Sequence, residues 1–554
     1  MGTSPNIVLC GFMGTGKTAV GRELAAMLGR EFIDVDDVIA ERHGGTVADI
    51  FAQVGEEGFR RRERAMVEEL APARGAVLAT GGGVLLDATN RDRLVAGGEL
   101  VLLTASPRVL ARRLAHDRDR PLLARAQDLL AHITALLAER APIYTPIERQ
   151  VDTSSLSAAE VAVRIARMFP REQAIGEIGV VGAAGHAPLA ARERTSTRVV
   201  TGRGACVDLG EELRRLGVVG QVVIAMPPPV RELYADRLVA AVRAADLPVS
   251  VIGVPDGDAQ KSFAAAVSIV DEMAGLGCDR SSCVVAAGGG VCGDLAGFAA
   301  SMYMRGVALA MVPTTLLAMV DAHLGGKTGV NTPRAKNLAG AFHPPLLVLA
   351  DPVVLDTLPD RELAGGYAEV VKTALIGDAA LFVELERTLL AGDRGDQDRR
   401  RDQRLLARCV AACAAVKGGV VTRDPWELGE RRVLNLGHTV GHALEAQRDL
   451  GLSHGEAVSL GLLVALRLSV RRGLAPASLL DRTRGLLAAC GLPTVIPAHD
   501  AAAVAERLRL DKKRRGENLA FVICREPGRV EIAEDTSVDE ALAALAEEHR
   551  CASS

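Results

Sequence analysis

Apolar and polar residues alternate in blocks along the first 170 residues, and the blocks show two different periods. Short apolar runs predict buried strands, and the stretch at 17–29 predicts an amphipathic helix. The runs that predict strands lie at 6–12, 31–37, 76–83 and 99–105. Because strands and helices follow one another in turn, the pattern favours a parallel sheet flanked by helices.

The pattern changes after residue 170. Residues 171–197 are rich in glycine and alanine and have no helical period, which predicts a linker. A second strand-and-helix pattern covers 198–355, and residues 356–548 are nearly all helical in their pattern. The sequence therefore predicts an α/β domain at 1–170, a linker, a second α/β domain and a C-terminal helical domain.

Charge and composition narrow the range of partners. The net charge is −4 and aromatic residues make up only 3% of the chain, which disfavours nucleic-acid binding. The ten cysteines include no Cys-x-x-Cys pair, and the N-terminus has no signal-peptide pattern. The apolar segment 295–320 contains the central Arg305, so we expect buried strands there rather than a membrane span. A cytoplasmic protein without nucleic-acid or membrane partners is expected.

Lysine is scarce in this chain. Only eight of the 65 basic residues are lysine, and the others are arginine. A compact ammonium suits proton transfer and phosphate binding, so the retained lysines are expected to mark functional sites. They are Lys17, Lys261, Lys327, Lys336, Lys372, Lys417, Lys512 and Lys513.

The segment GFMGTGKT, residues 11–18, fits the pattern G-x-x-x-x-G-K-T between a predicted strand and a predicted helix. Its glycines, which include Gly14 and Gly16, allow backbone N–H groups to surround phosphate oxygens at a helix N-terminus. Lys17 would contact the outer phosphates of a nucleotide, and Thr18 would ligate Mg²⁺. The first half is therefore expected to bind a nucleoside triphosphate.

Other polar segments follow this loop. Asp34 and Asp36 end the second predicted strand, and as strand residues two apart they would share one face. One could serve the metal ion and the other a substrate hydroxyl. GFRRRE (58–63), the triple glycine at 81–83 and an arginine-rich loop before Pro121 come next. That loop could close over a transferring phosphoryl group.

With these motifs, residues 1–170 resemble shikimate kinases. The resemblance implies a P-loop kinase fold, the cofactors ATP and Mg²⁺, and phosphorylation of a ring hydroxyl of shikimate. It implies that Asp34 assists Mg²⁺, that Asp36 orients or deprotonates the attacking hydroxyl, and that Arg120 lies in the lid. The residues implied for shikimate binding are Asp36, Arg60, Gly81, Gly82, Gly83 and Arg140. A different small-metabolite kinase, such as a gluconate kinase, is disfavoured by the combined motifs.

The second half contains a possible metal site. His438 and His442 stand four residues apart and could ligate one ion from one helix face. His454 and Glu369 offer further ligands, and spacing alone does not choose three of these four. Three histidines flanked by glycines within 17 residues favour a metal site over ordinary buried histidines. The strand–glycine–helix segment at 284–298 could admit a pyrophosphate, although close packing would use the same glycines.

The motifs over 197–545 resemble 3-dehydroquinate synthases, and this resemblance chooses among the ligands. It implies that Glu369, His438 and His454 bind Zn²⁺, or another divalent ion such as Co²⁺, and that His442 faces the substrate. It also implies NAD⁺ as a recycled cofactor and the cyclisation of the sugar-acid phosphate DAHP to 3-dehydroquinate with release of phosphate. Such synthases are commonly dimers, so a homodimer through this half is expected.

The same resemblance supplies the remaining positions. The catalytic groups that it implies are Asp321, Lys327, Lys372, Arg431 and His442. The substrate-binding residues that it implies are Arg305, Lys327, Asn337, Lys417, Asn435 and Lys512. The residues that it implies for NAD⁺ are Asp258, Lys261, Gly289, Gly290, Asp294, Thr314, Thr315 and Lys336.

The sequence thus predicts a bifunctional enzyme of chorismate biosynthesis with an α/β fold: a P-loop kinase domain, a Rossmann-like α/β domain and a C-terminal all-helical domain. One alternative joins a small-metabolite kinase to a metal-dependent polyol dehydrogenase, which would accumulate NADH. A further alternative makes the first half a nucleotide sensor. The acceptor-site residues Asp36, Arg60 and Arg140 disfavour that alternative, because a sensor has no acceptor to bind.

Overall fold

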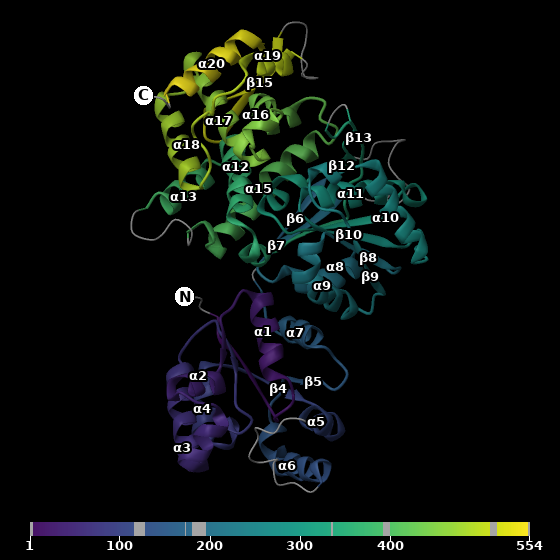
Figure 1. Ribbon diagram of the computed structural model, residues 1–554, viewed down its shortest axis with the longest axis vertical. Helices are drawn as coiled ribbons and strands as arrows, with labels where there is room; N and C mark the ends of the chain where they lie inside the picture. The colour runs from purple at the N-terminus through teal and green to yellow at the C-terminus, as the bar shows by residue number, and fades with distance from the viewer. Residues whose placement is uncertain are drawn as a thin grey trace. The chain divides into compact units, whose positions relative to one another are not determined.

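The computed structural model describes residues 4–115, 128–171, 173–179, 196–333, 336–391, 399–509 and 518–551. Its internal contacts define two compact units. One unit consists of Met1–Pro170 with Asp236–Asp246, and the other of Arg171–Ala235 with Leu247–Ser554. Each unit contains its own large sheet (Figure 1).

The first unit is built on a five-stranded parallel sheet of order β2–β3–β1–β4–β5. Its strands are β1 (Asn6–Gly11), β2 (Phe32–Asp34), β3 (Val77–Ala79), β4 (Gly98–Thr104) and β5 (Gln150–Asp152). Its helices are α1 (Lys17–Leu28), α2 (Val35–His43), α3 (Val47–Leu70), α4 (Ala88–Gly97), α5 (Pro107–Leu114), α6 (Leu129–Tyr144) and α7 (Ala158–Arg167). Every residue of the central strand β1 is buried, as expected where helices cover both faces of a parallel sheet.

The second strand is shorter than the sequence pattern predicted. β2 ends at Asp34 and α2 begins at Val35, so Asp36 lies in the first turn of a helix. The prediction that Asp34 and Asp36 share a strand face is therefore wrong. Asp34 is instead the N-cap of α2, because its Oδ1 accepts a hydrogen bond from the backbone N–H of Asp36 at 3.0 Å.

The second unit has a seven-stranded sheet of order β6–β7–β14–β11–β10–β8–β9, parallel except for β6. Its strands are β6 (Gln173–Gly179), β7 (Ser196–Gly202), β8 (Val222–Met226), β9 (Val249–Gly253), β10 (Cys283–Gly288), β11 (Ala308–Pro313) and β14 (Leu347–Ala350). The helices of this α/β part are α8 (Leu209–Arg215), α10 (Phe263–Gly275), α11 (Gly290–Met302) and the first half of α9 (Pro228–Arg243), whose residues from Asp236 onward are counted with the first unit. A small antiparallel pair, β12 (Lys327–Val330) and β13 (Ala339–Phe342), completes it.

Two segments of the α/β part differ from the sequence prediction. Residues 173–179, predicted as linker, form β6 and pair antiparallel with β7 along the sheet edge. The first part of the apolar segment 295–320, predicted as strand, belongs to α11, and only Ala308–Pro313 is strand. Small residues let α11 pack closely on β10, β11 and β12, so its nearly continuous apolar sequence shows little helical period.

The rest of the second unit is mainly helical and packs on the α/β part. Its helices are α12 (Asp360–Gly377), α13 (Ala379–Leu389), α15 (Gln403–Arg423), α16 (His438–Glu445), α17 (His454–Arg471), α18 (Ala477–Ala489), α19 (Ala501–Arg509) and α20 (Val538–Cys551). An antiparallel hairpin of β15 (Asn518–Glu526) and β16 (Arg529–Ser537), absent from the sequence prediction, lies between α19 and α20 in the chain.

Within the described residues, α15 is the one helix whose length and composition would allow it to cross a membrane. Of its apolar window, 61% is buried inside the protein. It packs against α12, β6 and β7, and a core helix of a globular protein gives the same signal.

Candidate active sites

The loop between β1 and α1 forms a cradle of backbone N–H groups. Gly14 and Gly16 take the left-handed conformation, with φ of 78° and 91°, which glycine adopts without steric cost. α1 begins at Lys17 without a side-chain cap, so the N–H groups of its first turn can point at phosphate oxygens. Lys17 Nζ donates to the carbonyls of Gly11 and Phe12 at 3.0 Å each, which holds the ammonium at the same loop.

The two residues predicted to bind Mg²⁺ are in contact beside this loop. Thr18 Oγ1 donates a hydrogen bond to Asp34 Oδ2 at 2.7 Å. Asp34 is nearly buried, and its other oxygen caps α2. A hydroxyl and a carboxylate next to a phosphate-binding loop supply the oxygen ligands that Mg²⁺ prefers.

The residues predicted to bind the acceptor meet at the triple glycine. A Cβ added to Gly81 would lie 2.6 Å from Asp36 Oδ1, and one added to Gly83 would lie 2.3 Å from Arg60 Nη2. Arg140 Nη1 donates to the carbonyl of Gly82 at 2.6 Å. Gly81 and Gly83 are therefore needed for space, because a side chain at either position would displace the polar group beside it.

Sequence reasoning missed Glu63, which belongs to the same group. Arg60 Nη1 donates to both oxygens of Glu63, at 2.8 and 3.0 Å, and Glu63 is only 1% exposed. Burial raises the pKa of Glu63, and the Arg60 guanidinium opposes this shift. The signal was available, because an arginine and a glutamate three apart on a helix face each other. The predicted lid residue Arg120 and the predicted substrate residue Lys512 lie outside the described residues.

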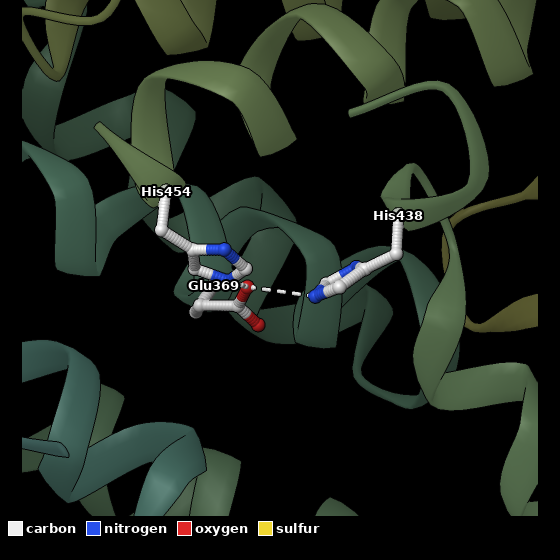
Figure 2. A group of neighbouring side chains, drawn as sticks. All are labelled: Glu369, His438 and His454. Atoms are coloured by element: carbon white, nitrogen blue, oxygen red, sulfur yellow. Dashed lines mark ion pairs between the residues drawn. The ribbon is translucent and has the colours of Figure 1, made fainter. Parts of the chain in front are cut away.

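In the second unit, Glu369, His438 and His454 converge. The Nε2 atoms of His438 and His454 lie 3.5 and 3.6 Å from Glu369 Oε1. Each residue offers one possible ligand atom, and these three atoms all lie within 4.8 Å of one another. Both imidazole rings point toward the Glu369 carboxylate (Figure 2). The residues come from α12 and from the first positions of α16 and α17.

Surrounding groups orient both rings. His438 Nδ1 bonds the Leu436 carbonyl at 3.2 Å, and His454 Nδ1 bonds Glu445 Oε2 at 3.1 Å. With the Nδ1 atoms used in this way, the Nε2 atoms are directed at one point, as in histidines that ligate a metal ion. No hydrogen bond of good geometry reaches either oxygen of the fully buried Glu369 among the described residues. Lys372 Nζ pairs with Oε2, whereas Oε1 faces the Nε2 atoms of both histidines, where a metal ion could complete its coordination.

Charges next to the cluster set its protonation. Burial alone would raise the pKa of Glu369, but the Lys372 ammonium, whose Nζ contacts Oε2, and the contact with His454 outweigh it and hold the pKa at about 2. Burial and Lys372 keep the pKa of His438 well below its usual value, so this ring is neutral. Burial would also lower the pKa of His454, but its contacts with the carboxylates of Glu369 and Glu445 raise it to about 10.

His442 does not join the Glu369 group. It is exposed one turn after His438, and the two ring centroids are 5.0 Å apart at nearly a right angle. It belongs to a second group with Glu445 and His454. The pairing of His438 with His442 that spacing favoured is thus not the pairing seen, because His438 points into the core and His442 points out.

A cluster of buried charges lies beside Glu369. Lys417 Nζ donates to the Asp321 carbonyl at 2.7 Å and to Asp321 Oδ1 at 2.6 Å, and Lys372 Nζ lies 3.6 Å from the same carboxylate oxygen. Lys372 is 1% exposed. Burial lowers the pKa of Lys417, and Asp321 opposes this shift. Burial alone would raise the pKa of Asp321, but the two ammonium groups hold it well below its usual value.

Three further predicted residues lie around the 424–435 segment. Lys327 Nζ pairs with Glu427 Oε2, and Asn435 Nδ2 donates to Glu427 Oε1 at 3.3 Å. Arg431 is buried and donates to the carbonyls of Pro425 and Gly325, at 2.7 and 3.2 Å. The structure therefore brings Lys327 and Asn435 together through a glutamate that the sequence analysis did not assign.

The residues predicted for the dinucleotide form a second polar network. Lys261 is buried, and its Nζ contacts Asp294 Oδ2 and Asn337 Oδ1. Asn337, predicted as a substrate residue, thus joins this network and has a left-handed φ of 52°. Lys336 Nζ lies 3.0 Å from Asp258 Oδ2.

The glycine turn after β10 opens an uncapped helix. α11 begins at Gly290, and its N-cap Gly289 offers no side-chain hydrogen bond. A Cβ on Gly289 would lie 3.2 Å from Thr315 Cγ2, so this turn has little room for a side chain. Thr314 donates its N–H to the Gly288 carbonyl at 3.0 Å, which ties the ends of β10 and β11 together.

Arg305 is the predicted substrate residue that stands apart. It is exposed at the end of a short 3₁₀ turn, with a left-handed φ of 69°. Within the described part of the chain it makes no hydrogen bond or ion pair with the charged cluster around Glu369.

Together these features define a class: a P-loop phosphotransferase followed by a metal-site enzyme built from an α/β part and a helical part. Comparison with known families specifies it further. The shikimate kinase profile matches residues 13–169, the 3-dehydroquinate synthase N-terminal profile matches 251–365, and the C-terminal profile of the same family matches 366–514.

Individual relatives agree with these profiles. The chain is 42% identical over 358 residues to 3-dehydroquinate synthase from Caulobacter vibrioides, covering 63% of this chain and 95% of the relative. It is 46% identical over 312 residues to the synthase from Halorhodospira halophila, covering 56% and 85%. A solved 2-epi-5-epi-valiolone synthase from Streptomyces hygroscopicus, with NAD⁺ and Zn²⁺ bound, matches with a TM-score of 0.58 and 29% identity, covering 65% of this chain and 98% of that one.

The chain belongs to the 3-dehydroquinate synthase family and carries a shikimate kinase domain ahead of the synthase. It is a bifunctional enzyme of aromatic biosynthesis, in which one unit is a kinase and the other a lyase. The predicted fold class, a P-loop domain followed by a Rossmann-like α/β part and a helical region, is confirmed.

Proposed function

We propose that the first unit transfers a phosphoryl group from ATP to shikimate, and that the second converts DAHP to 3-dehydroquinate and phosphate with Zn²⁺ or Co²⁺ and NAD⁺. The observation that carries the second assignment is the convergence of Glu369, His438 and His454, with Lys372 beside them. The first assignment rests on the phosphate cradle and on the polar groups around the triple glycine.

In the kinase unit, each residue has a role that its chemistry supports. Thr18 and Asp34 would hold Mg²⁺, which neutralises phosphate charge when bound. Asp36 would orient the acceptor hydroxyl and take its proton. Arg60 and Arg140 would bind the carboxylate of shikimate, which suits the planar guanidinium fork.

In the synthase unit, the donor set fits a catalytic metal ion. One carboxylate and two imidazoles leave coordination positions for substrate, and outer bonds to Leu436 and Glu445 orient the rings. When bound, the ion polarises a substrate hydroxyl, and NAD⁺ accepts and later returns a hydride. The NAD⁺-binding residues that we propose are Asp258, Lys261, Gly289, Gly290, Asp294, Thr314, Thr315 and Lys336.

The substrate carries a carboxylate and a phosphate, so it needs several cations. We assign this role to Lys327, Lys417, Arg431 and, from the undescribed segment, Lys512. Asp321 would hold Lys372 and Lys417 in place, because its carboxylate contacts both ammonium groups. His442, exposed beside the metal ligands, would move a proton during loss of phosphate.

Two assays on the same preparation test the proposal. With DAHP, NAD⁺ and zinc, we expect phosphate release without net accumulation of NADH. With shikimate and ATP, we expect ADP formation that depends on Mg²⁺. A zinc-selective chelator should stop the first reaction and spare the second. Steady accumulation of NADH would instead indicate a polyol dehydrogenase and overturn the synthase assignment.

Two variants separate the units. Lys17→Met should abolish the kinase reaction and leave the synthase reaction intact, because Lys17 lies at the phosphate cradle of the first unit. Glu369→Gln should do the reverse. Loss of both activities in either variant would show that the two units do not work independently.

We also propose a homodimer through the synthase unit and a cytoplasmic location. The location is supported by nine cysteines, from Cys10 to Cys524, that stand as free thiols. Light scattering of the purified chain tests the dimer, and a truncated synthase unit that still dimerises would assign the interface to that half.

A further inference from the structure

Glu445, at the end of α16, connects the proposed metal site to a second set of residues. Its Oε2 accepts a hydrogen bond from His454 Nδ1 at 3.1 Å, and its Oε1 lies 3.0 Å from Lys336 Nζ. Its side chain is only 17% exposed. Each oxygen of the carboxylate therefore has a separate partner, one on each side.

Lys336 continues the connection. Besides Glu445, its ammonium contacts Asp258 Oδ2 at 3.0 Å. Asp258 in turn accepts hydrogen bonds from Asn331 Nδ2, at 3.0 Å through its carbonyl and 3.2 Å through Oδ1. Asn331 also donates its N–H to the Lys261 carbonyl at 2.8 Å. The chain of contacts thus runs from a proposed metal ligand to the proposed dinucleotide network.

An alternative explanation is that His442, Glu445 and His454 bind a second metal ion. Such an ion would lie next to Lys336, whose ammonium already contacts Glu445. It would also take His454 Nδ1, while Nε2 of the same ring is directed at Glu369. The contacts fit better with Glu445 as the outer partner of one metal site than with a second site.

We infer that Glu445 and Lys336 are positioning residues that couple metal binding at Glu369, His438 and His454 to dinucleotide binding at the Asp258 segment. This inference rests on the proposed function of the synthase unit. A metal ion on His454 Nε2 fixes the ring in the orientation in which Nδ1–H donates to Glu445, and so fixes Glu445 as well. Glu445 then holds Lys336 against Asp258, so each cofactor should favour the other.

Metal affinity tests the first link. Glu445→Gln keeps the size of the side chain but removes its charge, and should weaken zinc binding by about 10- to 100-fold, the usual effect of an outer-shell change. Competition with a chromophoric chelator measures this without any turnover. Glu531→Gln is the control, because Glu531 pairs with Arg525 on the β15–β16 hairpin and belongs to neither the metal group nor the dinucleotide network. Unchanged zinc affinity in Glu445→Gln would overturn the inference.

Lys336→Met tests the second link. A residue that only contacts the dinucleotide would not affect zinc binding in the absence of NAD⁺. The inference predicts weaker zinc binding in this variant without NAD⁺, because Glu445 loses the ammonium that holds it. Zinc affinity equal to that of the unchanged protein would show that Lys336 serves the dinucleotide alone, and would refute the coupling.

Calorimetric titration with NAD⁺ measures the coupling directly. Zinc-loaded protein should bind NAD⁺ more tightly than chelator-treated protein, by about fivefold, at the lower end of typical coupling because Lys336 is partly exposed. In Glu445→Gln the ratio should fall to near one. Equal NAD⁺ affinities of the zinc-loaded and chelator-treated unchanged protein would refute the coupling alone. Failure to bind zinc or NAD⁺ at all would refute the proposed function.

Discussion

The substitution Lys372→Met probes the buried charge on which the metal site depends. Lys372 is 1% exposed, its Nζ contacts Glu369 Oε2, and it lies 3.6 Å from Asp321 Oδ1. Methionine has a similar length but no charge. In the absence of metal, the variant leaves the Glu369 carboxylate buried without its main counter-charge, whereas Asp321 keeps Lys417.

The size of the effect follows from the pKa of Glu369. An ordinary value of 4.5 falls to about 2 in the folded chain, although burial pushes it upward. That difference corresponds to about 3 kcal/mol in favour of the charged form. It agrees with the cost of about 3–5 kcal/mol for removing one partner of a buried ion pair. We therefore expect metal-free Lys372→Met to lose stability of this order.

The dependence on pH has a defined sign. Because the folded pKa of Glu369 lies below its unfolded value, the carboxylate contributes stability above about pH 4.5, and this contribution is lost as the pH falls toward 2. In the variant, burial is less opposed and the pKa of Glu369 rises. The difference between the two proteins should therefore be largest near neutral pH and should narrow in acid.

The single tryptophan provides a selective assay. Trp426 lies in the second unit, 5.1 Å from the ring of Phe342, so its fluorescence reports unfolding of that unit alone. The fluorescence is followed during urea unfolding with and without zinc. The transition is assigned to the second unit alone, because a two-unit chain need not unfold in one step. Zinc should stabilise the variant more than the unchanged protein, because the ion restores positive charge beside Glu369.

Arg525→Met is the control for this prediction. Arg525 pairs with Glu531 at 2.7 Å, and both side chains are partly exposed, so its loss should cost at most about 1 kcal/mol. The reasoning fails if metal-free Lys372→Met is no less stable than this control. It also fails if zinc stabilises Lys372→Met and the unchanged protein equally.

Three further outcomes are expected. Glu63→Gln should raise the KM for shikimate about tenfold with little change in the KM for ATP, and equal changes in both constants would contradict this. The reason is that Glu63 orients Arg60 through a hydrogen bond to a charged group, which contributes about 1.5–3 kcal/mol. Gly83→Ala should lower kinase activity only, since its Cβ would lie 2.3 Å from Arg60 Nη2, whereas Gly45→Ala, with its nearest contact at 3.4 Å, should have no effect. Zinc binding at neutral pH should release a proton, because contacts with two carboxylates raise the pKa of His454 to about 10. Calorimetry in buffers of different ionisation enthalpy measures this release, and a binding heat that does not depend on the buffer would count against it.

The parts of the fold that the sequence predicts well are those with one dominant local signal. The loop at 11–18 needs glycines at left-handed positions and a following helix, and the structure has both. Strand β6 and the β15–β16 hairpin of the second unit were harder to predict. β6 pairs only along the sheet edge, and four consecutive residues within it are exposed, so its sequence lacks a buried period. The β15–β16 hairpin, with nine residues in each strand, lies between helices in the chain, and its turn glycine, Gly528, is a signal that could have indicated it.

The metal cluster shows where local spacing stops being informative. His438 and His442 are one helical turn apart, yet the helix begins at His438 and buries it, while His442 faces outward. The ligands that converge come from three helices, and α12 is far in the sequence from α16 and α17, so only tertiary packing brings Glu369 to the two histidines. Glu445 and Glu63 have the same character, because each is an ordinary helical glutamate until its partner is known.

The contacts of the lysines suggest a physical reason for expecting lysine at the candidate sites. The lysines within the described residues are Lys17, Lys261, Lys327, Lys336, Lys372 and Lys417. Lys17 bonds carbonyls of the phosphate cradle, and the other five each contact a carboxylate at a candidate site. Arginine fills most other ion pairs, both exposed ones such as Arg42–Glu69 and largely buried ones such as Arg198–Glu212, where a forked cation binds a carboxylate well. A buried point between Glu369 and Asp321 needs a single compact ammonium, because a guanidinium there would bring five donors that the space could not satisfy. Replacement of lysine by arginine at such points would carry that penalty, which explains why lysine persists there in a chain that otherwise uses arginine.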